Sequence, residues 1–311
     1  MKPMTQPAHH APSLLTPRVL IPFVIVTLIW GSTWFVIRDG LGEVPPIWSV
    51  TYRFIIASLG MAVYLAATQQ SFRLDRAGWM LALAIGVTQF VTNYNFVYLA
   101  EGYITSGLVA VVFALLIIPN SLLSRLFMKT RLSRAFLAGA VIAVTGVALL
   151  LAHEYRVAAA GSGIGGNMVM AGIGFTLLAV TAASISNVVQ QTQAARRQNM
   201  FALVGWAMAI GALLDGVLAY ASSGPPVFSW DARYWAGVSY LALAGSTLTF
   251  PLYYGIIRKV GAGQAAWSSV LIPVIAMLIS TWLEGFHWSG LAIAGSLLVA
   301  AGLVIAVRGK G

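Results

Sequence analysis

The sequence predicts an all-α polytopic membrane protein with ten transmembrane helices, arranged as two inverted five-helix repeats around a central cavity. Composition, the spacing of apolar runs and an internal repeat predict this fold. Of the 311 residues, 59% are hydrophobic and 8% are charged, whereas soluble domains carry about 25% charged residues. Mean hydropathy is +0.86. Because so few polar groups could not cover a surface in water, we expect the lipid bilayer to surround the chain.

Ten apolar runs are long enough to cross the hydrocarbon core, which takes about 20 residues as a helix. They divide the chain into a disordered cytoplasmic tail (1–17), a first repeat (18–152), an outer linker (153–167), a second repeat (168–307) and a cytoplasmic C-terminus (308–311). In chain order the runs are 19–38, 46–67, 78–99, 103–126, 135–152, 168–193, 201–220, 234–257, 261–283 and 288–307.

Lys and Arg residues set the predicted orientation. With a cytoplasmic N-terminus, fourteen basic residues fall in inner segments and three, Arg38, Arg156 and Arg233, fall in outer segments. This asymmetry is the positive-inside signal of membrane proteins. It predicts that both termini are cytoplasmic, and it accounts for the net charge of +10 without any binding of nucleic acid.

An internal repeat links the two halves of the chain. An offset of 156 residues aligns 72–146 with 228–302 without a gap, and thirteen of the 75 aligned positions are identical. Tyr98 pairs with Tyr254 in this alignment. Because five helices per repeat is an odd number, the two copies must be inverted relative to each other, as in many transporters.

A stripe of small residues marks the fifth and tenth helices. Gly139 and Gly146 lie seven residues apart, as do their equivalents Gly295 and Gly302. Small residues let membrane helices approach closely, so the stripe predicts a helix–helix or dimer contact rather than a ligand site. A monomer is compatible with the sequence.

Ionisable residues inside a membrane are the first place to look for function. Asp215 lies close to the outer end of its helix, so we expect its carboxylate to reach the headgroups. Arg53 lies deeper, where it can reach the interface, hold a helix carbonyl or bind a substrate carboxylate. No acidic residue is expected near the midplane, which disfavours proton coupling through a buried carboxylate and acid/base catalysis. Because cysteine is absent and the histidines fall in tails and outer loops, we expect no metal or cofactor.

Neutral polar and aromatic residues remain as candidates for a site between the repeats. Asn and Gln are costly in lipid, so we expect them to face a cavity or a firm partner, although small polar residues commonly join helices instead. Tyr98 and Tyr254 are candidate outer and inner gates. The candidate substrate-binding residues are Trp30, Trp34, Gln89, Asn93, Tyr98, Asn187, Thr247, Tyr254 and Trp267.

Several segments resemble a known family. Trp30-Gly31-Ser32-Thr33-Trp34-Phe35 resembles the opening of the EamA-type branch of the drug/metabolite transporter superfamily. Tyr52-Arg53-Phe54, Leu271-Ile272-Pro273 and Glu284-Gly285 follow the same pattern, and the resemblance covers about residues 19–307. Among members, the chain looks most like the YddG-type inner-membrane exporters of aromatic and other amino acids.

This resemblance implies a bacterial inner-membrane protein whose cavity lies between the first, third, fourth, sixth, eighth and ninth helices. It implies an exporter, not an enzyme, that moves amino acids and other small zwitterionic metabolites by alternating access. Two alternatives stay open: an exporter of aromatic or cationic drugs, and a membrane protein that does not transport. The membrane glutamate of the small four-helix relatives has no counterpart here, so we do not expect an analogous proton/drug antiport.

Overall fold

The computed structural model describes four stretches of the chain, residues 16–129, 132–160, 166–265 and 268–308. The first half contains α1 (Pro17–Asp39), α2 (Pro46–Ala67), α3 (Arg76–Ile85), the π-helix η1 (Gly86–Asn93), α4 (Tyr94–Glu101), α5 (Ser106–Phe113), the 3₁₀ turn η2 (Ala114–Leu116), α6 (Ile117–Met128) and α7 (Arg134–Ala160). The second half contains α8 (Gly166–Gln191), α9 (Gln193–Arg197), α10 (Met200–Ser223), α11 (Ala232–Ala242), the π-helix η3 (Leu243–Leu248), α12 (Thr249–Ala265), α13 (Ser268–Leu283) and α14 (Gly290–Arg308). Most of the predicted N-terminal tail and C-terminus lies outside the described residues.

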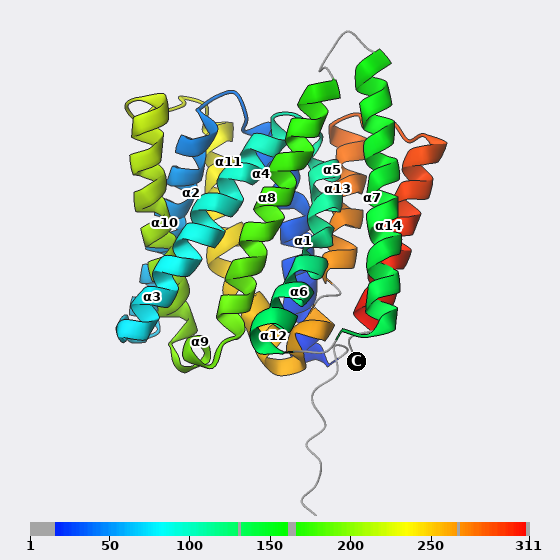
Figure 1. Cartoon of the computed structure of the whole chain (residues 1–311). Coiled ribbons are helices and arrows are strands. Elements are labelled where there is room, and N and C mark those ends of the chain that lie inside the picture. The colour runs from blue at the N-terminus through cyan, green and yellow to red at the C-terminus, as the bar shows by residue number, and fades with distance from the viewer. Residues whose placement is uncertain (1–15, 130–131, 161–165, 266–267, 309–311) are drawn as a thin grey trace, which may run out of the picture.

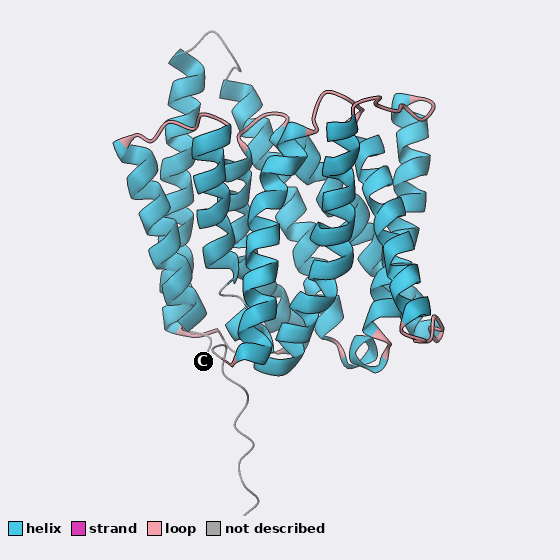
Figure 2. Ribbon diagram, turned by 180° about the vertical axis from the view of Figure 1, so that it is seen from behind, coloured by secondary structure: helices cyan, strands magenta, loops and turns pink. Residues whose placement is uncertain are grey.

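The described loops gather at the two ends of a helical bundle, as Figure 2 shows from behind. Between these ends, large apolar side chains face outward, among them Val141 on α7 and Leu297 on α14, each 66% exposed. A soluble surface rarely carries such a continuous apolar area. It suits lipid, because each helix satisfies its own backbone groups there.

Seven helical segments of the described residues are long and apolar enough, by length and composition, to cross a membrane. Two shorter apolar helices, Ser268–Leu283 and Gly290–Ala306, follow them. The joined elements α11, η3 and α12 form a further helical segment. α1 begins and α14 ends at the same end of the bundle (Figure 1), as an even number of crossings requires. The count of ten crossings stays a prediction.

Two helices extend past their predicted ends. α7 continues to Ala160, through much of the predicted linker 153–167, and α12 continues through Lys259 to Ala265. Hydropathy predicts where an apolar run ends, whereas a helix ends where its backbone hydrogen bonding ends. The α7 extension contains three alanines and one arginine, which are good helix formers, so it prolongs the helix instead of breaking it.

The two halves run in opposite directions at equivalent positions. In Figure 1, α3 leads upward through η1 to α4, whereas α11 leads downward through η3 to α12. Adding the 156-residue offset to η1 gives 242–249, which encloses η3. Both halves therefore carry a π-helix at the same place in the repeat. π-Helical turns are rare and frequently occur at functional sites.

The glycine stripe forms a helix–helix contact within the chain. α7 and α14 pack so closely that a Cβ atom on Gly146 would lie 2.6 Å from the carbonyl oxygen of Gly295. A Cβ atom on Gly302 would lie 2.4 Å from the backbone nitrogen of Ala143. The predicted close contact is confirmed between these two helices, because the atoms that exclude a side chain are rigid backbone.

Gly146→Ala should therefore destabilise the protein, because the new methyl group forces α7 and α14 apart. Overpacking of this kind costs about 1–3 kcal/mol. Gly174→Ala on α8 is the matched control, because nothing lies within 4 Å of its added Cβ atom, and replacing a helical glycine by alanine gains about 0.5–1 kcal/mol. Thermal unfolding of both variants in detergent tests this, and a similar shift for both would contradict it.

Candidate functional site

A cavity of about 120 Å³ lies between the two halves of the chain. Cavities of this order hold a benzene-sized molecule. Its walls come from α1, η1, α4, α5, η2, α8, α12 and α13, which belong to the six predicted helices named by the family resemblance. Six of the candidate residues line it, namely Trp30, Trp34, Gln89, Asn93, Asn187 and Tyr254.

One wall of the cavity is aromatic. Trp30 packs against Tyr253 and Phe250, with ring centroids 4.9 and 5.6 Å away. Its indole N–H donates to the carbonyl oxygen of Gly245, 3.2 Å away, in the π-helix η3. Because a π-helix displaces the normal backbone hydrogen bonds, η3 supplies an acceptor that fixes the orientation of this ring.

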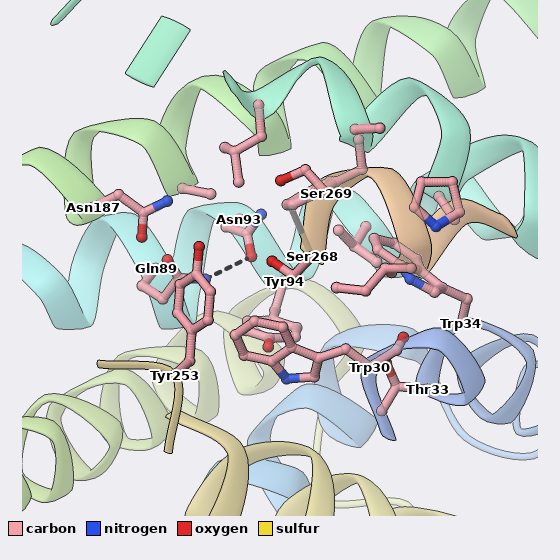
Figure 3. A pocket seen from close by; sticks show the side chains of 18 of the residues that line it. Trp30, Thr33, Trp34, Gln89, Asn93, Tyr94, Asn187, Tyr253, Ser268 and Ser269 are labelled. Atoms are coloured by element: carbon pink, nitrogen blue, oxygen red, sulfur yellow. Dashed lines mark hydrogen bonds between the residues drawn. The ribbon is translucent and has the colours of Figure 1, made fainter. Parts of the chain in front are cut away.

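The facing wall carries amide groups (Figure 3). Gln89 donates to the side-chain oxygen of Asn93 (3.1 Å), and Asn93 donates to the backbone carbonyl of Ala179 on α8 (3.0 Å). Asn187 makes a long 3.5 Å contact to Asn120. Within the described residues, nothing donates to the side-chain oxygens of Gln89 and Asn187. These two oxygens are therefore available to a ligand.

The indole N–H of Trp34 is a further unpartnered group. Its ring packs against Phe113, with centroids 5.2 Å apart, and its Nε1 atom is buried without a hydrogen-bond partner among the described residues. Buried Trp N–H groups normally find a partner. The cavity lining thus combines aromatic rings with neutral polar groups, and no charged side chain lines it within the described residues.

Arg53 lies directly behind the cavity wall. Its guanidinium stacks on the ring of Tyr94, which lines the cavity, at 4.3 Å from the ring centroid. Its Nε and Nη2 atoms donate to the hydroxyl of Ser246, both at 3.2 Å. The side chain is only 1% exposed, so the interpretation that Arg53 reaches the membrane interface is wrong. Hydroxyl groups and an aromatic face hold the charge inside the bundle.

Two acidic residues are also buried, contrary to the sequence interpretation. Asp215 is 0% exposed, and its Oδ1 atom accepts a hydrogen bond from Asn95 on α4 at 2.6 Å. The expectation that Asp215 reaches the headgroups is therefore wrong. Glu101, at the end of α4, is also 0% exposed. Helix contacts cover both carboxyl groups, Asp215 within α10 and Glu101 at the end of α4.

Tyr98 lies outside this cavity, in a second one of about 190 Å³ at the end of the bundle where α1 ends. An ion pair between Asp39 and Arg233 (2.6 Å) joins α1 to α11 there. Ile37 lines both cavities and separates them. The second cavity therefore extends the central one toward the predicted outer face.

The remaining candidates occupy other places. Thr247 lines neither cavity; its hydroxyl bonds the carbonyls of Ala57 on α2 (3.0 Å) and Ala242 (3.2 Å), so it joins two helices. Trp267 lies outside the described residues. Tyr253 and Ser269 line the cavity but were not predicted. The internal repeat drew attention to Tyr254 and so to its neighbour Tyr253. No sequence signal distinguished Ser269.

Ser246→Ala should destabilise the protein, because the Nε atom of buried Arg53 loses its only hydrogen-bond partner among the described residues. Leaving such a group unsatisfied costs about 1–3 kcal/mol. Ser58→Ala is the matched control, since the hydroxyl of Ser58 bonds only the carbonyl of Ile55 in its own helix. Thermal unfolding in detergent measures both, and an equally small effect of the two substitutions would exclude a structural role for this hydroxyl.

Comparison with known proteins places the chain in a family. A protein of Salmonella typhimurium named "Probable amino-acid metabolite efflux pump" is 24% identical, covering 92% of this chain and 93% of its own. The "Uncharacterized inner membrane transporter YedA" of Escherichia coli K12 is 28% identical, covering 91% and 88%. A solved crystal structure, 20% identical, shares the fold with a TM-score of 0.67 over 92% of this chain and 95% of that one. Because the EamA-like transporter family matches residues 18–152 and again 170–308, the chain belongs to that family of membrane transporters.

Proposed function

We propose that the chain exports amino acids and other small zwitterionic metabolites across the bacterial inner membrane, with both termini cytoplasmic. The observation that carries this proposal is the cavity between the two halves, whose walls pair aromatic rings with unpartnered neutral polar groups. A carrier needs such a site, because its substrate must bind weakly enough to be released. The efflux pump name of the Salmonella relative agrees with export.

A zwitterion fits the two walls in complementary ways. The rings of Trp30 and Tyr253 attract an ammonium group, at about 0.5–2 kcal/mol for each good contact, and the side-chain oxygens of Gln89 and Asn187 accept its hydrogens. The indole N–H of Trp34 donates to the carboxylate.

Alternating access requires two gates, and the inverted halves supply equivalent tyrosines for them. Tyr254 lines the central cavity and accepts a hydrogen bond from Gln190 on α8. Tyr98 lies beyond Ile37 in the second cavity. In our proposal Tyr254 closes the inner side and Tyr98 the outer side, and movement of Ile37 joins the two cavities during export.

A second candidate function is the export of aromatic or cationic drugs. The observation that favours it is the share of rings in the cavity wall, which includes Trp30, Trp34, Tyr94, Phe113, Phe250, Tyr253 and Tyr254. A planar cation can stack between such rings without using the amide groups. The amino-acid proposal instead requires those amides, so variants of the amides separate the two functions.

Efflux from liposomes that contain only the purified protein tests both functions. Vesicles are loaded in turn with a labelled aromatic, aliphatic or charged amino acid, or with an aromatic dication. Amino-acid efflux above that of protein-free vesicles is the expected result. Efflux of the dication alone supports the drug exporter, and no efflux of any compound contradicts transport of these substrate classes.

Asn187→Ala should raise the KM for amino-acid transport about 2- to 10-fold, as expected for a lost hydrogen bond of about 0.5–1.5 kcal/mol. Thr181→Ala on the same helix is the control, because Thr181 is exposed on the bundle surface and bonds only the carbonyl of Leu177. Initial rates at varied substrate concentration give both KM values. Equal KM values in the two variants would remove Asn187 from the site.

A further inference from the structure

Glu101 is a buried acid whose carboxyl group has no partner that would stabilise a negative charge. The residue is 0% exposed, and both carboxyl oxygens lack a hydrogen-bond partner within the described residues. It also ends α4, and the carbonyl end of a helix disfavours negative charge. Because an ionised carboxylate cannot stay buried unless it is paired, the geometry requires a proton on Glu101 in this conformation.

The surrounding groups explain why no cation pairs with it. α4 packs against α1, α2, α5, α8 and η1, of which α5, α8 and η1 contain no ionisable side chain. The groups within electrostatic range of Glu101 are Arg38 from α1, Arg53 from α2, Tyr98 from α4 itself, and Glu284, which follows α13. Arg38 donates to the carbonyl of Ile104 at 3.4 Å, and Arg53 contacts Ser246 and Tyr94. Neither guanidinium donates to Glu101 among the described residues, and the Nη1 atom of Arg53 is itself buried without a partner there.

The neighbouring Glu284 shows the opposite arrangement. Its carboxylate accepts hydrogen bonds from the backbone N–H of Ser106 (3.1 Å), the hydroxyl of Ser106 and the hydroxyl of Ser280 (2.8 Å). Glu284 therefore has three hydrogen-bond donors, whereas Glu101 has none among the described residues.

A series of neighbouring polar groups connects Glu101 to the central cavity. Tyr98 precedes Glu101 by three residues on the same helix, and therefore shares its face. Arg53 lies beside Tyr98, and its Nη2 atom reaches the hydroxyl of Tyr94 at 3.4 Å. Tyr94 lines the cavity. The guanidinium thus stands between the proton on Glu101 and the site proposed for substrate.

We propose that Glu101 is a proton-binding site coupled to the cavity through Arg53, so that the protein exchanges protons for substrate. This inference rests on the proposed function. While Glu101 is protonated, the guanidinium stays on the Tyr94 ring and repels an ammonium group in the cavity. When the O–H bond breaks and the proton passes to water, the carboxylate draws Arg53 away. Ammonium binding and proton binding then oppose each other, and such coupling is reciprocal.

Gradient-driven uptake into proteoliposomes tests this exchange. We expect an acidic lumen to drive accumulation of labelled amino acid by the wild-type protein. Glu101→Gln, which keeps the size of the neutral acid, should lose this accumulation while retaining counterflow of label against unlabelled amino acid without a gradient. Accumulation that persists in Glu101→Gln, or counterflow in the wild type without any effect of the gradient, overturns the proposal.

Asp215→Asn is the matched control, because Asp215 is an equally buried acid that contacts Asn95 and not Arg53. It should retain both activities. Loss of accumulation in Asp215→Asn together with its retention in Glu101→Gln assigns the proton to Asp215 and overturns the proposal. If Glu101→Gln does not fold, Glu101→Asp takes its place: a shift in the pH of half-maximal accumulation supports the proposal, and an unchanged pH profile overturns it.

A measurement without substrate separates this inference from the proposed function. Infrared spectra of the membrane-embedded wild-type protein, recorded while the pH is varied, should show a protonated carboxyl band that Glu101→Gln lacks and Asp215→Asn keeps. Absence of that difference overturns the proton site. If the band is present but every counterflow assay fails, Glu101 remains a proton site. That result refutes only the proposed amino-acid transport.

Discussion

The requirement that every backbone polar group be satisfied within lipid governs this structure. Regular α-helix meets it wherever the chain faces the bilayer. The irregular turns η1, η2 and η3 all border the cavity or the helices that enclose it, where neighbouring groups take up the displaced bonds. Gly245 illustrates this, since its carbonyl accepts from the Trp30 indole and from the hydroxyl of Thr249 at 2.7 Å. The site therefore lies where the helices are allowed to be irregular.

Packing divides the bundle into a rigid part and an open part. α7 and α14 meet through glycines, with backbone against backbone, and leave no room for a side chain. The central helices are instead held apart by the rings of Trp30, Trp34 and Tyr253, which are too large and too planar to close the space between them. The proposed exporter would use both, because rigid elements transmit movement while the open region admits substrate.

Buried charge gives the neutral cavity its electrostatic character. No charged side chain lines it within the described residues. Arg53, however, lies behind the ring of Tyr94 on α4, and Glu101 lies at the end of α4. A guanidinium on the far face of Tyr94 affects any charge in the cavity without contacting it. This arrangement leaves the site able to release what it binds, since a direct ion pair in a dry interior would hold a substrate tightly.

The sequence by itself determined the membrane class, the approximate helix positions, the glycine contact and six of the cavity residues. These features follow from hydropathy and residue spacing, which depend only on the order of residues along the chain. Only the tertiary structure decided the burial of Arg53, Asp215 and Glu101, because burial depends on which helices pack around each position. It also decided the position of Thr247: the π-turn shifts the ordinary helical register, so its hydroxyl meets α2 instead of the cavity.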